Sequence, residues 1–254
     1  MLFGKRILLI IGGGISAYRS LELIRLLRKR GCSVSTCLTE GGSNFVTPLS
    51  VSALAGEKVH QDLFDLTDES EMGHIELSRA ADLVVVAPCT ADFMAKIANG
   101  FANDLASTLL LATDRPLLLA PAMNVRMWNH PSTKRNHSTL MSDGAYFVGP
   151  NDGEMACGDF GPGRMSEPEQ IALEAEKILK SGPLKNTHVI VTSGPTHEPI
   201  DPIRYIGNRS SGAQGTAIAT ALSNLGADVT FISGPSSVKH PSGVKLVKVE
   251  TAER

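Results

Sequence analysis

The residue whose type most clearly suits ligand binding is Asn124, which lies in the segment Pro121-Ala-Met-Asn-Val-Arg-Met-Trp128. A carboxamide carries two donors and one acceptor in a plane, which suits it to hold a carboxylate or an amide. The same segment contains Met123, Met127 and the only Trp of the chain, Trp128. This composition favours a ligand-binding loop, and a core loop closed by the Trp is the alternative.

A further candidate is Cys157, which lies in the glycine-rich segment Gly153-Glu-Met-Ala-Cys-Gly-Asp-Phe-Gly-Pro-Gly-Arg-Met165. Glycine-rich loops are poor core material, so the segment predicts a mobile flap that carries a reactive group. A thiol in such a flap acts as a proton donor or a nucleophile. A buried and inert cysteine is the alternative.

His74 is another candidate, at the start of a helix expected over residues 72–80. An imidazole titrates near neutral pH, so His74 suits a general base or a ring-stacking partner. A structural histidine is the alternative. Farther along, Cys89-Thr-Ala-Asp92 follows an apolar run, and its small hydroxyl and thiol groups suit contact with a flat heterocycle or a phosphate. Helix capping by Thr90 or Asp92 is the alternative there.

A glycine turn near the N-terminus predicts a phosphate site. Gly12, Gly14 and Ala17 satisfy a loose G-x-G-x-x-A pattern after an apolar run. Such glycines let backbone N–H groups approach a phosphate at a helix N-terminus. An acid that would bind a ribose should end the next strand, but Thr39 stands there and Glu40 comes later. The pattern therefore predicts phosphate binding without NAD specificity, and a turn with no ligand is the alternative.

These candidates follow short apolar runs that read as buried strands of a parallel sheet, which carries helices on both faces. In an open α/β sheet, ligands bind outside the carboxyl ends of the strands. The runs predict a doubly wound α/β fold in which the candidates meet at one sheet edge. The expected strands are 7–11, 32–38, 82–88, 116–120 and 146–148, and the expected helices are 18–30, 49–55, 72–80, 93–111 with a soft break at 99–100, 132–142 and 167–179.

The pattern restarts after a linker at Ser181-Gly-Pro183. A strand is expected at 188–192, a helix at 213–225 and a strand at 228–233, with a Pro-rich loop at 193–204. We therefore predict two domains, 1–180 and 181–254. The shorter of them is expected to be incomplete, because a doubly wound domain typically needs on the order of 100 residues.

Bulk properties exclude several classes of protein. The chain has 254 residues and a net charge of −2, so nothing favours nucleic acid or a membrane surface as a partner. Its apolar runs are strand-length, so no membrane span is expected. The four cysteines show neither a CxxC pair nor a metal-ligand spacing. We expect no metal site in the first domain and a reducing, cytoplasmic location with free thiols.

Several of these motifs together resemble one family. Across residues 4–180 the chain is similar to the decarboxylase half of the bifunctional coenzyme A biosynthesis flavoproteins, which join phosphopantothenoylcysteine decarboxylase to phosphopantothenate–cysteine ligase. Residues 193–212 resemble the start of the ligase half. The resemblance to the decarboxylase half rests on the glycine turn 12–17, Gly73-His-Ile75, Ala87-Pro-Cys-Thr-Ala91, Pro121-Ala-Met-Asn124 with Met127-Trp128, Ala156-Cys-Gly158 and Gly163-Arg-Met165.

The resemblance implies a flavodoxin-like or Rossmann-like domain that binds FMN, followed by the start of another Rossmann-like domain. It implies a homotrimer, or a dodecamer built of trimers, with the site between subunits. The flavin ring lies against the loop that ends in Trp128. The residues implied around FMN are Gly13, Ser16, Thr39, Phe45, Pro88, Cys89, Thr90, Ala91 and Ala122.

The implied reaction is decarboxylation of 4′-phosphopantothenoylcysteine to 4′-phosphopantetheine. Asn124 holds the substrate carboxylate, with Met127 and Trp128 beside the substrate. His74 lies by flavin and substrate, and Cys157 donates a proton. For the ligase half, the resemblance implies nucleotide or substrate contacts by Asn208, Ser211 and Gly212, with CTP and Mg²⁺ required only if that half is complete.

Two departures from the family pattern matter. The family usually shows Ala-Thr-Ala-Asn where this chain has Cys89-Thr-Ala-Asp92, and an acid that points inward would repel a phosphate or a carboxylate. The family often has Lys-Met where this chain has Ala213-Gln214. We therefore expect no ligase activity from this chain. An NAD-type oxidoreductase and a catalytically silent regulatory flavoprotein remain the alternative functions.

Overall fold

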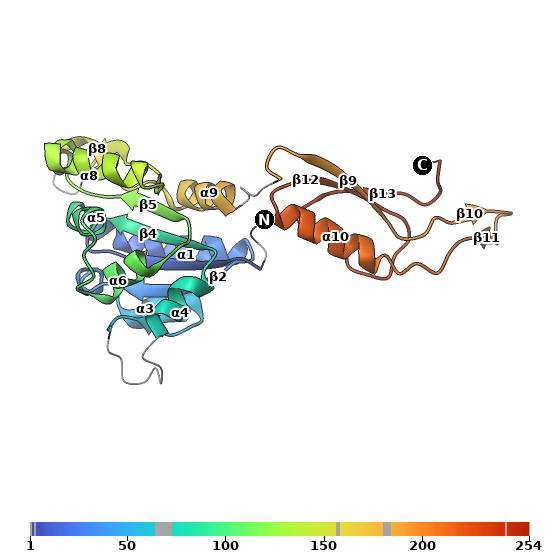
Figure 1. The fold of residues 1–254 in the computed structure, drawn as a ribbon, viewed down its shortest axis with the longest axis horizontal. Helices are drawn as coiled ribbons and strands as arrows, with labels where there is room; N and C mark the ends of the chain where they lie inside the picture. The colour runs from blue at the N-terminus through green and yellow to red at the C-terminus, as the bar shows by residue number, and fades with distance from the viewer. Residues whose placement is uncertain are drawn as a thin grey trace. The chain divides into compact units, whose positions relative to one another are not determined.

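The computed structural model describes residues 2, 4–63, 73–155, 158–179, 184–241 and 243–253, with the backbone alone at 73–75. The chain divides into two compact units, Leu2–Glu176 and Lys177–Arg254 (Figure 1). No helix in the described ranges is long and apolar enough to cross a bilayer.

The first unit is built on a six-stranded sheet in the order β3-β2-β1-β4-β5-β6, and every pair in it is parallel. This is the strand order of the Rossmann fold, with the order reversing between β1 and β4. The predicted doubly wound α/β fold is therefore confirmed. The strands are β1 (Arg6–Ile11), β2 (Ser33–Leu38), β3 (Val59–His60), β4 (Leu83–Cys89), β5 (Leu117–Pro121) and β6 (Tyr146–Phe147).

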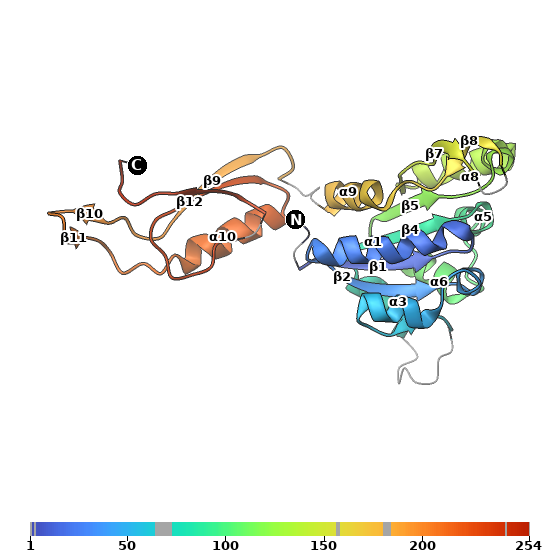
Figure 2. The same cartoon turned by 180° about the vertical axis from the view of Figure 1, so that it is seen from behind.

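Helices cover both faces of this sheet (Figure 2). One side holds the pair α1 and α3. Ion pairs tie α1 to Glu167, just before α9, through Arg19, and tie the C-cap Arg30 to Glu176 near the end of α9 at 3.7 Å. The other side holds α4 to α8, which share one hydrophobic cluster. The helices are η1 (Ile15–Ala17), α1 (Tyr18–Lys29), α2 (Glu40–Ser43), α3 (Pro48–Ala55), α4 (Gly73–Ala80), α5 (Ala91–Ala98), α6 (Leu105–Ala112), α7 (Val125–Asn129), α8 (Pro131–Ser142) and α9 (Pro168–Leu179).

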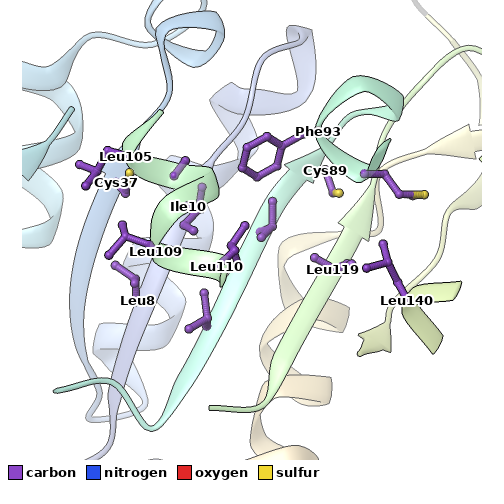
Figure 3. Close-up of a cluster of buried hydrophobic side chains, with 14 of the residues drawn as sticks. Leu8, Ile10, Cys37, Cys89, Phe93, Leu105, Leu109, Leu110, Leu119 and Leu140 are labelled. Carbon is purple, nitrogen blue, oxygen red and sulfur yellow. The ribbon is translucent and has the colours of Figure 1, made fainter. Parts of the chain in front are cut away.

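The core explains why the strand sequences are apolar throughout. Alternate strand residues point to opposite faces, and in β1 all of Ile7–Ile11 are buried. Leu8 and Ile10 pack against Leu109 and Leu110 of α6 in the cluster drawn in Figure 3. Full burial of one such side chain stabilises the fold by about 1.5–3 kcal/mol.

The helix predicted over 93–111 with a soft break at 99–100 is interrupted at that point, and the break is a complete one. Two helices, α5 and α6, occupy this range, and Asn99 is the C-cap of the first. Asp104 then begins α6 with a capping box, because its carboxylate accepts the backbone N–H of Ser107 at 2.8 Å and its own N–H donates to the Ser107 hydroxyl at 3.2 Å. The new cap makes this a true helix start.

The glycine-rich segment contains an antiparallel hairpin that the sequence did not predict. Its strands are β7 (Asn151–Glu154) and β8 (Phe160–Arg164). Two glycines of β8 have positive φ, Gly161 at 147° and Gly163 at 157°. A segment that needs such φ values gives no strand signal by propensity.

In its described residues the second unit contains a three-stranded parallel sheet in the order β13-β12-β9, a two-stranded arm and one whole helix. The predicted strands at 188–192 and 228–233 and the helix at 213–225 are confirmed. The elements are β9 (His188–Ser193), β10 (Glu198–Pro199), β11 (Tyr205–Ile206), α10 (Ala213–Asn224), β12 (Asp228–Ser233) and β13 (Lys245–Lys248).

Candidate active site

The glycine turn after β1 lies at the point where the strand order reverses. A Cβ at Gly12 would lie 2.3 Å from the carbonyl oxygen of Pro88, and one at Gly13 would lie 3.2 Å from the backbone of Gly41. The turn therefore packs closely against the end of β4 and the segment that follows β2. Position 12 accepts only glycine. Crevices at such reversal points are where open α/β sheets bind ligands.

One cavity of about 440 Å³ opens on this turn, on the side of α5 and α6. Gly12, Gly13, Thr39 and Thr90 contribute to its lining. Its size lies in the range typical of small-molecule sites. The structure thus brings three predicted cofactor residues, Gly13, Thr39 and Thr90, to one cavity.

The two threonines differ in what their hydroxyls can still offer. Thr39 donates its hydrogen to the carbonyl of Ile11 at 3.0 Å and accepts the N–H of Gly42 at 3.0 Å, as the N-cap of α2. Thr90 accepts the N–H of Phe93 at 3.2 Å as the N-cap of α5. Within the described part of the chain the Thr90 hydroxyl has no acceptor, so Thr90 is the better donor to a ligand.

Asp92, the departure from the family pattern, lines the 440 Å³ cavity together with Glu40 and Asp104. Its side chain is 81% exposed and lies 3.9 Å from Lys96 Nζ. Lys96 also contacts Asp104 at 3.1 Å. Burial acts to raise the pKa of Asp104, but the hydrogen bonds from Ser107 and Lys96 outweigh it and leave that pKa lowered.

Another cavity, of about 480 Å³, lies beyond Gly14 on the same turn. It brings the predicted residues Ser16, Ala122 and Asn124 together with residues of the β7–β8 hairpin. The Ser16 hydroxyl makes no hydrogen bond to the residues that the structure describes. The full lining is Gly14, Ile15, Ser16, Tyr18, Arg19, Ala122, Met123, Asn124, Glu154, Met155, Gly163, Arg164 and Met165.

Asn124 is fixed in this cavity by contacts on both edges of its carboxamide. It is the N-cap of α7, and its Oδ1 accepts the backbone N–H of Arg126 at 2.8 Å. Its Nδ2 donates to Oδ2 of Asp159 at 2.7 Å. Asn124 Nδ2 therefore already donates to an internal carboxylate, and a role for Asn124 toward a substrate carboxylate stays a prediction.

A carboxylate also joins the far end of the hairpin to α1. Glu167 accepts Arg164 Nη2 at 2.8 Å and pairs with Arg19 Nη1 through its other oxygen. Both arginines line the cavity that contains Asn124. Arg19 was not among the predicted residues, and Arg164 appeared only within a motif. No local pattern in the sequence indicates that these two arginines share Glu167.

Cys89 faces the core rather than the crevice. Its thiol is fully buried, and burial raises its pKa to about 12. The carbonyl of Cys89 accepts the N–H of Ala122 at 3.0 Å, which joins the ends of β4 and β5. Contact between Cys89 and a cofactor is thus limited to its main chain.

In the described part of the first unit, six predicted residues lie outside the lining of both cavities, namely Phe45, Pro88, Cys89, Ala91, Met127 and Trp128. Phe45 is 46% exposed and Met127 is 48% exposed. Trp128 is 8% exposed, its ring lies 5.3 Å from that of His137, and Lys134 Nζ lies 4.3 Å from its centre. The Trp128 ring belongs to the core cluster, so its role beside a substrate or flavin stays a prediction.

The side chains of two candidates lie outside the described part of the structure. Cys157 lies outside the described residues, between the described Met155 and Gly158 of the hairpin turn. His74 lies in α4, and its side chain is outside what the structure describes. Pro88 lies near the end of β4, and Ala91 is the first residue of α5. The peptide bond before Pro88 is cis.

In the second unit the three predicted ligase residues meet at the start of α10. Asn208 Oδ1 accepts the N–H of Ser210 at 2.9 Å, and the Ser211 carbonyl accepts the Ser236 hydroxyl at 2.7 Å. Gly212 has φ 79°, and its carbonyl accepts the Ser193 hydroxyl at 2.9 Å. The turn is shaped by short polar side chains, as a nucleotide-binding turn would be.

Known proteins resemble both units. A coenzyme A biosynthesis bifunctional protein of Vibrio vulnificus is 46% identical over 252 residues, which are 99% of this chain and 63% of that protein. The chain thus spans less than two thirds of this relative. A DNA/pantothenate metabolism flavoprotein C-terminal domain model matches residues 184–254.

Solved structures resemble the first unit. A PPC decarboxylase variant complexed with pantothenoylaminoethenethiol has a TM-score of 0.62 and 31% identity, covering 70% of this chain and 99% of its own. The FMN-binding protein AtHal3 has a TM-score of 0.59 and 32% identity, covering 68% and 95%. The flavoprotein family model matches residues 1–179, and the chain therefore belongs to the flavoprotein family.

Proposed function

We propose that the first unit is an FMN-dependent decarboxylase of 4′-phosphopantothenoylcysteine, which yields 4′-phosphopantetheine for coenzyme A biosynthesis. The observation that carries the proposal is Asn124, whose carboxamide lines a 480 Å³ cavity beside the glycine turn and already binds a carboxylate. The solved structure of a PPC decarboxylase with a substrate-like thiol supports this choice of reaction.

The residues at the reversal point fit FMN. Gly14 has φ 115° and open space where a side chain would stand, so a ligand can approach its backbone. The hydroxyls of Ser16 and Thr90 supply donors. Asp92 lines the same cavity as Thr90, but its side chain is 81% exposed and lies 3.9 Å from Lys96 Nζ, which offsets part of its charge. We propose that Gly13, Ser16 and Thr90 contact the phosphate and ribityl chain, while Pro88–Ala91 and Ala122 border the ring.

The chain itself supplies orientation and protons. Asn124 holds the substrate carboxylate and so places the thiol-bearing carbon toward the crevice. Bound FMN supplies the electron acceptance that a carboxylate of this kind needs before CO₂ can leave, since a cysteinyl carbanion has no other sink. We propose that the Cys157 thiol protonates the carbon that loses CO₂, and that His74 lies beside the reacting atoms.

The decisive test is a reaction with carboxyl-labelled 4′-phosphopantothenoylcysteine. The FMN-loaded protein should release labelled CO₂ and 4′-phosphopantetheine in equal amounts, with no external oxidant. Cys157→Ser should retain FMN but lose most of this turnover. Absence of labelled CO₂ from FMN-loaded protein would exclude the decarboxylase, and equal activity in Cys157→Ser would remove the thiol from the mechanism.

We also propose that the protein assembles as a homotrimer or a multiple of trimers, with each site shared between subunits. The exposed apolar residues Ile15, Tyr18, Phe45 and Leu49 near the glycine turn support such a contact. Light scattering on purified protein tests this directly, and a monomer that is fully active would contradict it.

A further inference from the structure

We propose that Asp159 is a positioning residue that sets the orientation of the Asn124 carboxamide, and through it the affinity for the substrate carboxylate. The inference rests on the proposed function and assigns a role to a residue that the motifs do not single out. Asp159 lies 35 positions from Asn124 in the sequence, and its Oδ2 accepts Asn124 Nδ2 at 2.7 Å.

Two hydrogen bonds that Asn124 makes to described residues leave only one arrangement of its amide. The backbone N–H of Arg126 can only donate, so the atom that it meets at 2.8 Å must be the oxygen. The carboxylate of Asp159 can only accept, so it selects the nitrogen. Without Asp159 the oxygen is still fixed, but the nitrogen loses its charged partner. A hydrogen bond to a charged group is worth roughly twice a neutral one.

The position of Asp159 is imposed by how tightly the hairpin sits on the loop after β5. The N–H of Met123 donates to the carbonyl of Gly163 at 2.9 Å. A Cβ at Gly163 would lie 2.3 Å from the Met123 carbonyl oxygen, and one at Gly161 would lie 2.9 Å from Val125 Cγ2. Strand β8 therefore lies directly against residues 123–125, and the contact made by Asp159 is part of this docking.

The turn that carries Asp159 is itself closed by backbone bonds. Met155 donates its N–H to the carbonyl of Asp159 at 2.9 Å, and Gly158 donates to the carbonyl of Met155 at 2.9 Å. Among the described residues, Asn124 and Met155 line the 480 Å³ cavity and Asp159 does not. Asp159 therefore acts on a ligand through Asn124.

The test compares Asp159→Ala with Asp159→Asn in the FMN-loaded protein. The Asn side chain keeps an acceptor oxygen for Asn124 but removes the charge, so it separates the hydrogen bond from the charge. Asp152→Ala is the matched control, because Asp152 is an exposed acid of the same hairpin. The probes are the substrate, through KM and kcat, and 4′-phosphopantetheine, through its inhibition constant, because the product lacks the carboxylate.

Asp159→Ala should raise KM about tenfold or more, as expected for the loss of a hydrogen bond to a charged group. The inhibition constant of the product should change less than about twofold, which is within the range of a surface substitution. Asp159→Asn, whose neutral oxygen gives a hydrogen bond worth about half as much, should raise KM only about threefold, and Asp152→Ala should behave as the parent protein. A lower KM in Asp159→Ala would show that the Asp159 carboxylate competes with the substrate for Asn124, and would overturn the proposal. An equal loss of affinity for the product, or a KM in Asp159→Asn as high as in Asp159→Ala, would also overturn it.

A readout that does not depend on turnover separates this inference from the proposed function. In ligand-free protein labelled with ¹⁵N-asparagine, the side-chain amide protons of Asn124 should shift upfield in Asp159→Ala and stay near the parent position in Asp152→Ala. If the parent protein lacks decarboxylase activity but shows this shift, the proposed function fails and the positioning contact stands. An Asn124 signal that is unchanged in Asp159→Ala would overturn the positioning role.

Discussion

Each of the two units has a strand that is followed, after a connecting segment, by a helix, but the side chains of these elements are buried to different extents. In β1 every residue from Ile7 to Ile11 is buried, whereas in β9 only Val191 is buried and Ile190 is 60% exposed. Helix α1 buries Leu23, Ile24 and Leu27, while α10 buries only Ala219.

The difference comes from the layers around each strand rather than from the strand's own residues. β1 lies in mid-sheet between two helical layers, whereas among the described residues of the second unit a single helix accompanies the sheet. A strand with similar apolar residues is fully buried in one unit and half-buried in the other. Apolar composition therefore predicts a strand, and the layers decide how much each residue stabilises it.

The largest contrast should appear in activity. Asn124→Ala removes the amide that we assign to the substrate carboxylate, so decarboxylation should fall about 100-fold or more, on the scale of a lost charge-assisted hydrogen bond in a water-excluded site. Asn208→Ala, in the second unit, should leave CO₂ release unchanged. Steady-state assays of both variants check this, and an equal loss in the two would show that the units do not divide the chemistry as proposed.

Matched core substitutions should give the next largest contrast. Ile10→Ala removes a side chain with 0% exposure from the core of the first unit and should cost about 2–5 kcal/mol in the free energy of unfolding. Ile190→Ala, in β9 of the second unit and with 60% exposure, should cost less than about 0.5 kcal/mol. Urea unfolding followed separately for each unit measures both, and similar costs would refute the argument from layers.

Helix caps should show a smaller contrast. Thr47 accepts the N–H of Ser50 at 3.1 Å at the start of α3, and Thr47→Ala should cost about 1 kcal/mol. Ser211 precedes Gly212, the N-cap of α10, and accepts the N–H of Ala213 at 3.4 Å, a longer bond, so Ser211→Ala should cost only about half as much or less. Thermal unfolding of the two variants decides the order. A larger cost for Ser211→Ala would contradict it.

The smallest expected effect is on the free energy of unfolding at acidic pH. Asp104 has a lowered pKa in the folded first unit. Its contribution is therefore present above its unfolded pKa of about 3.9 and is lost as pH falls through the lower folded value. Asp104→Asn should make the loss of stability below about pH 4 shallower. Urea midpoints across this pH range test the sign, and a steeper loss in the variant would contradict it.

The sequence was informative about buried strands and much less so about contacts between distant segments. The runs at 7–11, 82–88 and 116–120 correspond to β1, β4 and β5, because a two-sided parallel strand needs uninterrupted apolar residues. β3 has two residues and gives no such signal. The soft break at 99–100 was predicted, but the new helix start depends on a capping box at Asp104 that the apolar pattern concealed.

The same limit applies to the site. Gly13, Thr39 and Thr90 share one cavity and Ser16, Ala122 and Asn124 share the other, as strand-end positions in a parallel sheet should. The pairing of Asn124 with Asp159 depends on the β7–β8 hairpin, whose strands carry glycines at unusual φ values and so lack β propensity. No local pattern could have predicted that contact.

The central claim is that a flavin binds at the glycine turn between the two cavities, and FMN titration of flavin-free protein tests it most directly. Flavin fluorescence should change saturably with one FMN per chain. Ser16→Ala should weaken the affinity about tenfold, in line with the loss of one hydrogen bond to a phosphate, and Thr47→Ala should leave it unchanged. A protein that is folded by circular dichroism but does not bind FMN would contradict the account.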